Sequence, residues 1–414
     1  MSALTDIKTE FLSELEFLCA FQSKVFLYPF NTVSKLKSIG YYVVLFSLLL
    51  TTTQLIYTLC VFGFVDILEL INIAPNIGVC LMTTIRYIKF RKHKDFYEGT
   101  LNHFYEDVWV IVPECSTKNL QTVSKYLLVG KYINRFLVYY SFPLILLVDA
   151  TPYILMTYEN NHSSDIRHYY PFNGWYPFDK VKWFYTAYAW ESFMTGLVVT
   201  IHMCSDMTNV SFIVYICMEL KLLGNCLEDL ITGEDVVDIT KRKNTRYIHR
   251  NIKRNLKNII KRLEYLKKTT SELNDILGDV MFINYIFGSV FISLTAFTFT
   301  VVDDLNRSLR YFFFFLSLLI SIFYQCLIGQ FAFESLVSHI LTNSPAVYSS
   351  NWPSADCATK KLMLILMMRM QRPFQLTAKG YVVINLNTFS EICSSSYQLF
   401  NLLRTFTLFS FIFT

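Results

Sequence analysis

The chain has 414 residues; 53% of them are hydrophobic and 17% aromatic, only 17% are charged, and the net charge is +5. Soluble domains carry about 25% charged residues, and a soluble protein of this length cannot hide so much apolar side-chain area. These proportions exclude an ordinary soluble enzyme or binding module and predict a membrane protein that crosses the bilayer several times.

Apolar segments long enough to span a membrane recur along the whole chain. A spanning helix needs about 20 apolar residues. The fourth segment is much longer than one bilayer, so we expect it to continue as a helix into the cytoplasm. By contrast, Lys360–Pro373 is too short to cross and is interrupted by Arg369, which favours a buried or interfacial helix below the membrane. The predicted spans are Ile39–Val65, Ile67–Ile88, Phe136–Tyr158, Val181–Met218, Val280–Val302, Tyr311–Phe333 and Val382–Thr414.

The loops between these spans differ in charge, and this difference predicts the orientation. Lys241–Lys268 holds twelve basic residues and a single acid, Glu264. Because basic loops stay in the cytoplasm, the N-terminus is predicted inside and the C-terminus outside. Asn161 begins an Asn-X-Ser sequon in a loop that this scheme places outside, so it is a candidate glycosylation site. We therefore expect an all-α membrane protein with seven transmembrane helices, a cytoplasmic N-terminus and an extracellular C-terminus.

The basic segment before the fifth span carries an apolar stripe at spacings of three and four, which indicates one face of a long helix. Two interpretations stay open. The helix packs on its own chain with its Lys and Arg residues toward anionic lipid, or it contacts another subunit. The stripe consists of Ile248, Ile252, Leu256, Ile259, Leu263 and Leu266.

The last span carries a polar stripe at spacings of 4, 3, 4, 3 and 4, which places its residues on one face of a helix. Polar groups are costly in hydrocarbon, so this face does not look at lipid. It either binds neighbouring helices together or lines water, as in an ion pathway. The stripe consists of Asn387, Glu391, Ser394, Gln398, Asn401 and Thr405.

If the stripe lines water, a pore needs several copies of this helix around an axis, because one chain offers one such helix. Leu402 and Phe406 lie one turn apart near the outer end of the span and are candidates for a gate that excludes water. Thr405 lies between them and offers a hydroxyl group to a passing ion. The prediction is an oligomeric channel.

The segment "LMLILMMRMQRPFQLTAKGYVVINLNTFSEICSSSYQLFNLLRTF" (Leu362–Phe406) closely resembles the C-terminal signature of insect odorant receptors. The matching elements are "QRP" after a short basic and apolar helix, "LTAKG", "L-x-TF" and "SY-x-x-F-x-LL". The rest of the chain matches in layout only, with seven spans, an inside N-terminus and long cytoplasmic helices.

This resemblance implies a ligand-gated, non-selective cation channel in the plasma membrane of olfactory sensory neurons. Family members form tetramers around one pore lined by the last helix, with cytoplasmic helical ends packed as an anchor domain. The connection between spans four and five lacks the co-receptor's large insertion, so the chain resembles a ligand-tuning subunit that pairs with the olfactory co-receptor (Orco). Matched residue by residue, the last helix places Leu402 and Phe406 at the gate, Thr405 at a polar pore position, and Gln398 and Asn401 below or beside them.

In that family a small volatile binds among spans two to six in the outer half of the membrane. The spans offer an aromatic, mostly apolar lining there, which suits a volatile with one polar group. For each aromatic residue, core packing is the competing interpretation. Asp149 and Glu191 are ionisable within the membrane, so each is either functional or hydrogen-bonded to a Tyr or Ser of another helix. The predicted lining residues are Leu70, Ala74, Leu146, Asp149, Ala150, Tyr153, Tyr185, Tyr188, Ser192, Phe314, Phe315 and Leu318.

The expected division of the chain follows from these assignments. We expect no cofactor, no metal site, no nucleic-acid partner and no enzymatic activity, because no nucleophile and base or metal-ligand spacing occurs. The alternative function is a seven-span receptor that signals through cytoplasmic partners without ion conduction. The predicted regions are an N-terminal cytoplasmic helix (1–38), spans one to four with the ligand pocket (39–220), cytoplasmic anchor helices (221–279), spans five and six (280–341), a cytoplasmic loop and short anchor helix (342–381) and the pore-lining span (382–414).

Overall fold

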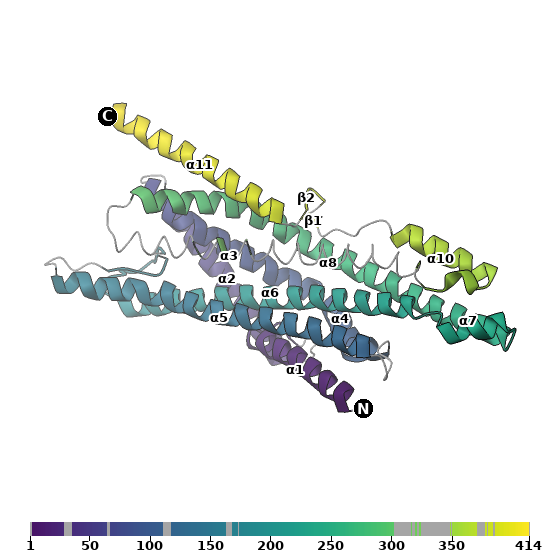
Figure 1. Cartoon of the computed structure of the whole chain (residues 1–414). Coiled ribbons are helices and arrows are strands. Elements are labelled where there is room, and N and C mark those ends of the chain that lie inside the picture. The colour runs from purple at the N-terminus through teal and green to yellow at the C-terminus, as the bar shows by residue number, and fades with distance from the viewer. Residues whose placement is uncertain are drawn as a thin grey trace.

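The chain folds into long helices that run roughly side by side (Figure 1). The computed structural model describes residues 2–28, 35–63, 67–110, 117–162, 168–172, 174–301, 350–370, 377–378, 380–383 and 386–413, with the isolated positions 316, 319, 320, 323 and 348. The helices are α1 (Ser2–Lys24), α2 (Lys35–Thr58), α3 (Ile67–Lys92), α4 (Lys94–Glu106), α5 (Thr117–His162), α6 (Phe184–Glu228), α7 (Gly233–Thr240), α8 (Thr245–Val301), α10 (Cys357–Met370) and α11 (Leu386–Phe413).

Four described helical segments are long and apolar enough to cross a bilayer: Lys35–Val61, Thr117–Tyr158, Phe184–Thr240 and Thr245–Phe297. They contain most of predicted spans one, three, four and five, while α3 and α11 cover spans two and seven. The sixth predicted span, Tyr311–Phe333, lies almost entirely outside the described residues.

Helices α6 and α8 each join a segment predicted to cross the membrane to a segment beyond it. The expected continuation of span four is confirmed, because α6 runs unbroken for 45 residues. The basic segment and the fifth span also form a single 57-residue helix, α8. No proline interrupts the α8 sequence, so the backbone hydrogen bonds continue from one environment into the next.

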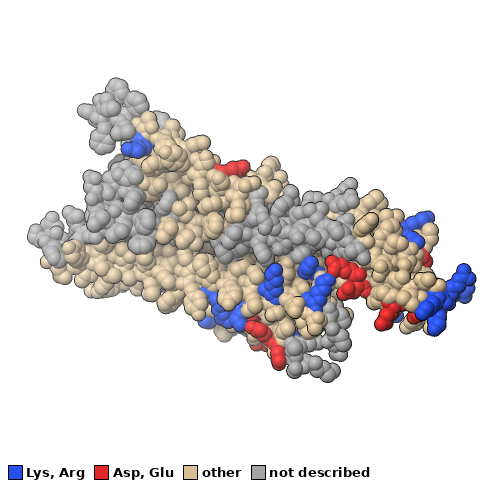
Figure 2. Space-filling model, viewed as in Figure 1, with Lys and Arg blue, Asp and Glu red and all other residues tan. Residues whose placement is uncertain are grey.

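Charged side chains divide the molecule into two halves along these helices. On the face shown in Figure 2, Lys, Arg, Asp and Glu gather over the half that contains α4, α7 and α10, and few described ones lie over the opposite half. A bilayer tolerates an uncharged apolar belt and rejects exposed charge. The charge distribution therefore indicates that the half with the C-terminal ends of α5 and α8 is the membrane half.

In the charged half, α6 lies at the centre of the core. From Met203 to Leu220 every α6 residue is buried, as expected for a helix that is covered on all sides. Aromatic rings fill the space around it. Phe11 of α1 lies 4.7 Å from Tyr215, and Phe104 of α4 lies 5.5 Å from both Phe212 and Tyr215 between ring centroids.

A buried ionic network also connects the helices of this half. Glu219 of α6 is fully buried; its Oε2 lies 2.8 Å from His103 Nε2 of α4, and its Oε1 accepts from Arg262 Nε of α8 at 2.5 Å. His103 Nδ1 lies 3.0 Å from Asp107 Oδ2. Burial lowers the pKa of His103, but the hydrogen bonds and charge of Glu219, together with Asp107, outweigh it, so the pKa is raised. The network therefore favours a protonated imidazole.

The apolar stripe predicted on the basic helix packs on its own chain. Leu256 is 0% exposed, Leu266 1% and Ile252 3%; Ile248 and Ile259 are also buried and Leu263 is half-buried. This confirms the own-chain interpretation of the stripe. A subunit contact through other faces of α8 stays a prediction.

The "LTAKG" motif contributes Thr377, Ala378 and Gly380 to a small hairpin between α10 and α11. Its strands are β1 (Thr377–Ala378) and β2 (Val382–Val383). Gly380 has a φ of +75°, a left-handed conformation that glycine adopts without strain. The backbone N–H of Thr377 donates to Asn274 Oδ1 of α8 at 2.7 Å. The motif thus reverses the chain before α11 and attaches the turn to α8.

Candidate ligand-binding site

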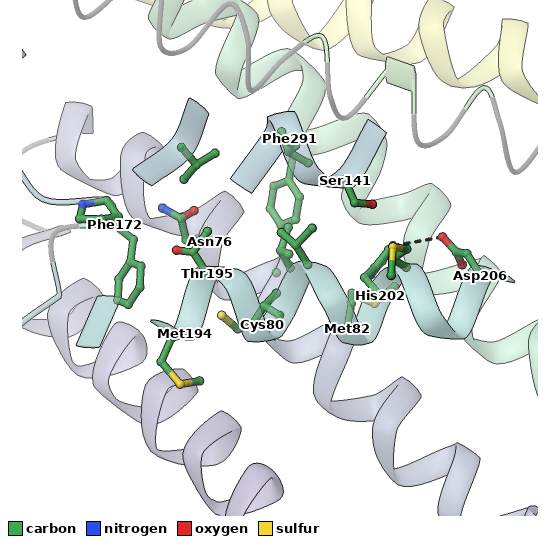
Figure 3. Close-up of a pocket in the computed structure, with 18 of the residues that line it drawn as sticks. Asn76, Cys80, Met82, Ser141, Phe172, Met194, Thr195, His202, Asp206 and Phe291 are labelled. Atoms are coloured by element: carbon green, nitrogen blue, oxygen red, sulfur yellow. Dashed lines mark ion pairs between the residues drawn. The ribbon is translucent and has the colours of Figure 1, made fainter. Parts of the chain in front are cut away.

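A cavity of about 210 Å³ lies among the helices of the membrane half. It is bounded by α2, α3, α5, α6 and α8 and by the loop that precedes α6 (Figure 3). A cavity of about 150 Å³ holds benzene, so this one accommodates a molecule somewhat larger. Its lining residues are mostly apolar. They include Leu55, Val79, Cys80, Met82, Leu137, Leu144, Val148, Phe172, Met194, Val198, Val199, Phe287 and Phe291, with the polar Thr51, Asn76, Ser141, Thr195, His202 and Asp206.

The loop before α6 lines the end of the cavity farther from the charged half, which is called the outer end below, and Glu191 holds this loop in place. Pro171 and Phe172 of the loop line the cavity. Glu191 is 0% exposed; its Oε2 accepts from the backbone N–H of Phe172 at 2.9 Å, and its Oε1 accepts from Gly174 N–H at 3.0 Å and the Tyr176 hydroxyl at 3.2 Å. A buried carboxylate is stable when several donors satisfy it. Glu191 therefore holds this loop against the cavity. The loop residues Pro171, Phe172 and Gly174–Tyr176 are called the cap below, and Glu191 is called its clamp.

The cap is also fixed to α2. The backbone N–H of Trp175 donates to Thr58 Oγ1 at 2.8 Å, and Gln54 Nε2 donates to the Trp175 carbonyl at 2.9 Å. The ring of Tyr57 lies 4.5 Å from that of Trp175. The loop thus joins α2 to α6 above the cavity.

One wall of the cavity depends on a glycine. The Phe291 ring of α8 lies directly over the Gly78 backbone of α3, so that an added Cβ at Gly78 would be 2.0 Å from Phe291 Cε2. Phe287, one turn away, stacks on Phe291 with centroids 5.4 Å apart. The absent side chain at Gly78 makes room for this aromatic wall.

The inner end of the cavity is polar. His202 and Asp206 of α6 both line it, and His202 Nε2 lies 3.7 Å from Asp206 Oδ2 (Figure 3). Arg86 of α3, 3% exposed, forms an ion pair with Asp206 Oδ1 through its Nη1. Pairing of this kind is what permits a charge in a low-dielectric interior.

None of the predicted ligand residues that the structure describes lines this cavity. Leu146, Ala150, Tyr153 and Tyr185 are exposed, and Ala74, Asp149, Tyr188 and Ser192 are half-buried beside it. The Leu70 side chain and the residues Phe314, Phe315 and Leu318 lie outside the described part of the structure. The assignment of these residues to ligand contact stays a prediction.

The cavity lies on the same helices as those predictions, but on a different face. On α5 the lining includes Leu137, Ser141, Leu144 and Val148, and on α6 it includes Thr195, Val198, His202 and Asp206. The lining residues of α5 and of α6 each recur at spacings of three and four. A stripe with this spacing that includes an occasional small or polar residue is the sequence signal that could have identified them.

The two ionisable residues singled out in the membrane have different surroundings. Glu191 binds the backbone of the cap, as described above. The Tyr188 hydroxyl of α6 donates to the backbone carbonyl of Asp149 on α5, and the Tyr153 and Tyr188 rings meet edge to face with centroids 6.1 Å apart. A tyrosine of another helix therefore forms a hydrogen bond at position 149, but the acceptor is the backbone carbonyl of Asp149 and not its carboxylate.

The terminal helix α11 packs against α8 through a face that includes Ile392 and Ser396, both buried. Ser396 Oγ lies 3.4 Å from Ser289 Oγ of α8. The polar stripe lies on another face: its residues are exposed apart from the half-buried Asn401. This chain's described residues therefore do not cover the stripe.

The predicted gate residues lie toward the end of α11. Leu402 is 53% exposed, and Gln398 and Thr405 are also exposed. The Thr405 hydroxyl donates to the Asn401 carbonyl at 2.8 Å, which leaves its oxygen lone pairs available. The side chain of Phe406 lies outside the described part of the structure. The pore assignment stays a prediction for these residues.

Comparison with known proteins identifies what the chain is similar to. A family model described as "7tm Odorant receptor" matches residues 113–397. Odorant receptor 92a of Drosophila melanogaster is 24% identical over 362 residues, which cover 82% of this chain and 79% of that protein. Odorant receptor 67c of the same species is 25% identical over 239 residues, which cover 56% of this chain and 54% of that protein.

The fold is also similar to a solved structure. The insect olfactory receptor OR5 from Machilis hrabei, in complex with eugenol, matches with a TM-score of 0.81 at 16% identity, covering 96% of this chain and 99% of that one. At this identity the likeness shows a shared fold. Together with the family match, it confirms the predicted all-α, seven-span membrane architecture.

Proposed function

The chain belongs to the odorant receptor family, and from this premise we propose that it is the ligand-tuning subunit of a ligand-gated, non-selective cation channel. A small volatile binds in the cavity among α2, α3, α5, α6 and α8. The pore is lined by α11 helices from several subunits. The observation that carries this proposal is the polar stripe of α11, which the described part of its own chain leaves exposed in a helix whose other residues are mostly apolar.

The cavity supports the ligand half of the proposal. Its apolar, aromatic walls suit a small volatile, since burial of each methylene contributes about 0.8 kcal/mol. The Machilis receptor was solved with eugenol, a small aromatic volatile. A molecule of that chemical class is the ligand we propose for this cavity.

A single helix connects the cavity with the proposed pore. Phe287, Gly288 and Phe291 of α8 line the cavity, while Ser289 of the same turn contacts Ser396 of α11. A ligand that fits one arrangement of α8 better than another shifts the population between them. Movement of this turn would displace α11 and widen the pore.

The assembly follows from the number of pore helices. Because one chain contributes one such helix, we propose a hetero-oligomer with the olfactory co-receptor (Orco), most simply a tetramer, in the plasma membrane of olfactory sensory neurons. Its N-terminus is inside and its C-terminus outside, and α7, α10 and the basic part of α8 belong to the cytoplasmic anchor. Asn161, exposed near the end of α5, would carry a glycan in this orientation.

The test is current recording from cells that express the chain with the co-receptor, during application of small volatile alcohols, esters and aldehydes. We expect currents whose reversal potential follows the cation gradients, and no ligand response without the chain. Leu402→Ala should raise the resting current, because a smaller side chain opens a dewetted constriction. Leu403→Ala, half-buried on the same face as Ser396, which packs against α8, is the matched control. Unchanged resting and evoked currents in Leu402→Ala would refute the gate, and cytoplasmic signalling without conduction would refute the channel.

A further inference from the structure

The polar inner end of the cavity contains more hydrogen-bonding capacity than the protein uses. Among the described residues, His202 Nδ1 is buried and has no hydrogen-bond partner, and the same holds for Nε and Nη2 of Arg86, which pairs with Asp206 but does not itself line the cavity. The separation of 3.7 Å between His202 Nε2 and Asp206 Oδ2 is too long for a hydrogen bond. Buried polar groups are normally satisfied, so this end is suited to receive a polar group from a ligand or from water.

The charges at this end restrict which polar group fits. Asp206 is already paired with Arg86 through its Oδ1, so the pair is close to neutral as a whole. A carboxylate ligand would meet the Asp206 charge, and an ammonium ligand would meet the Arg86 charge, each in a low-dielectric site where repulsion is strong. A neutral group is therefore favoured.

The two atoms that face the gap differ in hydrogen-bonding role. Asp206 Oδ2 is an acceptor, and a neutral His202 with its proton on Nε2 is a donor. A hydroxyl oxygen about 2.8 Å from each atom would accept from His202 and donate to Asp206. A carbonyl or ether oxygen there would turn its lone pairs toward the carboxylate, and this repulsion offsets the hydrogen bond from His202, so neither group gains from the subsite. A hydroxyl gains only when His202 holds its oxygen in place beside Asp206.

From this geometry we propose that His202 and Asp206 together form a subsite for a hydroxyl group, so that the cavity selects volatile alcohols or phenols over ethers and aldehydes of the same skeleton. This inference rests on the proposed function, because it assumes that the cavity is the ligand site. The rest of the molecule would lie along Val198 and Phe291 toward Phe172, which is at the other end of the cavity (Figure 3).

The sharpest test compares 2-phenylethanol with its methyl ether and with phenylacetaldehyde, on the full channel with its co-receptor. The half-maximal concentration of the alcohol should be about tenfold lower than those of the other two, as expected for an added hydrogen bond to a charged acceptor. His202→Phe should bring the alcohol to the level of the ether and leave the ether within about twofold of its wild-type value. His202→Asn, which keeps a donor, should preserve part of the preference.

Thermal stabilisation of the purified chain by the same three compounds gives a second readout that does not require conduction. The alcohol should stabilise the wild-type chain more than the ether does, and His202→Phe should abolish that difference. If currents are absent but this preference is present, the channel proposal fails and the hydroxyl subsite stands. An alcohol that is no better than its ether in the wild-type chain, or a His202→Phe variant with an unchanged preference, overturns the subsite.

Discussion

The two halves of the molecule pack around α6 in different ways. In the charged half, the Glu219 carboxylate is in contact with both His103 and Arg262, and aromatic rings fill the space around α6. In the membrane half, a cavity separates the helices, and His202 keeps an unpartnered ring nitrogen at its inner end. The first arrangement specifies one rigid packing, and the second leaves room for a guest molecule.

This difference indicates where specificity and where assembly are determined. A satisfied network and a dense core resist change, because breaking either leaves a buried charge or a void. A cavity with an unsatisfied end changes its energy when a ligand enters. Substitutions in the charged half should therefore act mainly on stability, and those around the cavity mainly on ligand response.

The largest effect is expected for Glu219→Ala. Its removal leaves Arg262 and His103 without their buried partner, and breaking such a pair costs about 3–5 kcal/mol. The purified protein should unfold at a clearly lower temperature, and less should reach the cell surface. The matched control is Glu272→Ala, whose ion pair with Lys268 is exposed and therefore contributes about 0–1 kcal/mol. Equal unfolding temperatures for the two variants would show that the network does not hold this half together.

The next largest effect should come from the clamp on the cap. Glu191→Ala removes an acceptor for three donors, and hydrogen bonds to charged groups contribute about 1.5–3 kcal/mol each. We expect a loss of ligand sensitivity of at least about tenfold, because Phe172 no longer closes the cavity. Dose–response recordings on a graded series sharpen the test. Tyr176→Phe should weaken ligand sensitivity least, Glu191→Ala most, and Glu191→Gln by an intermediate amount. The clamp would be refuted if all three variants had wild-type sensitivity at normal surface expression.

Much of the charged half can be predicted from sequence, because its signals are local. The apolar stripe of α8 and the loop charges appear as runs and spacings along the chain. The polar stripe of α11 appears in the same way, and its residues lie on a common face away from α8. Periodicity determines such features wherever a single helix carries them.

The cavity could not be predicted to the same depth, because it depends on contacts between distant segments. Asp149 and Val148 are neighbours in sequence, yet Val148 lines the cavity and Asp149 does not. The rotation of α5 about its own axis decides which of the two faces the cavity, and the hydropathy of the segment does not reveal that rotation. Glu191 was recognisable as unusual, but its partners are backbone N–H groups, which carry no sequence signature. The pairing of Arg86 with Asp206 likewise depends on how α3 and α6 cross.

A smaller effect is expected from Gly78→Ala, which tests whether the aromatic wall defines the cavity. The new Cβ would lie 2.0 Å from Phe291, so the ring must move. Because the cavity lies beside it, the ring can enter that space, and the cost to stability should be only about 1 kcal/mol, the low end for overpacking. The cavity then shrinks, and dose–response curves should shift most for the bulkiest active ligand. Phe291→Leu should restore the response in the double variant; a shift that is equal for small and large ligands would contradict the steric explanation.

The smallest expected effect is the dependence of stability on pH, which tests the ionic network of the charged half. The pKa of His103 is raised above its ordinary value of about 6.5 by Glu219 and Asp107, despite the opposing effect of burial. Its contribution to stability is therefore complete below that ordinary value and is lost as the pH rises through the raised one. The unfolding temperature of the purified protein should fall as the pH rises above about 6.5, and His103→Asn should flatten this slope. His93 is the control, because burial and the neighbouring Lys92 and Lys89 lower its pKa. The His93→Asn variant should still lose stability as the pH rises. A slope that survives in His103→Asn would mean that the imidazole is neutral in the network, and that Glu219 is held by Arg262 alone.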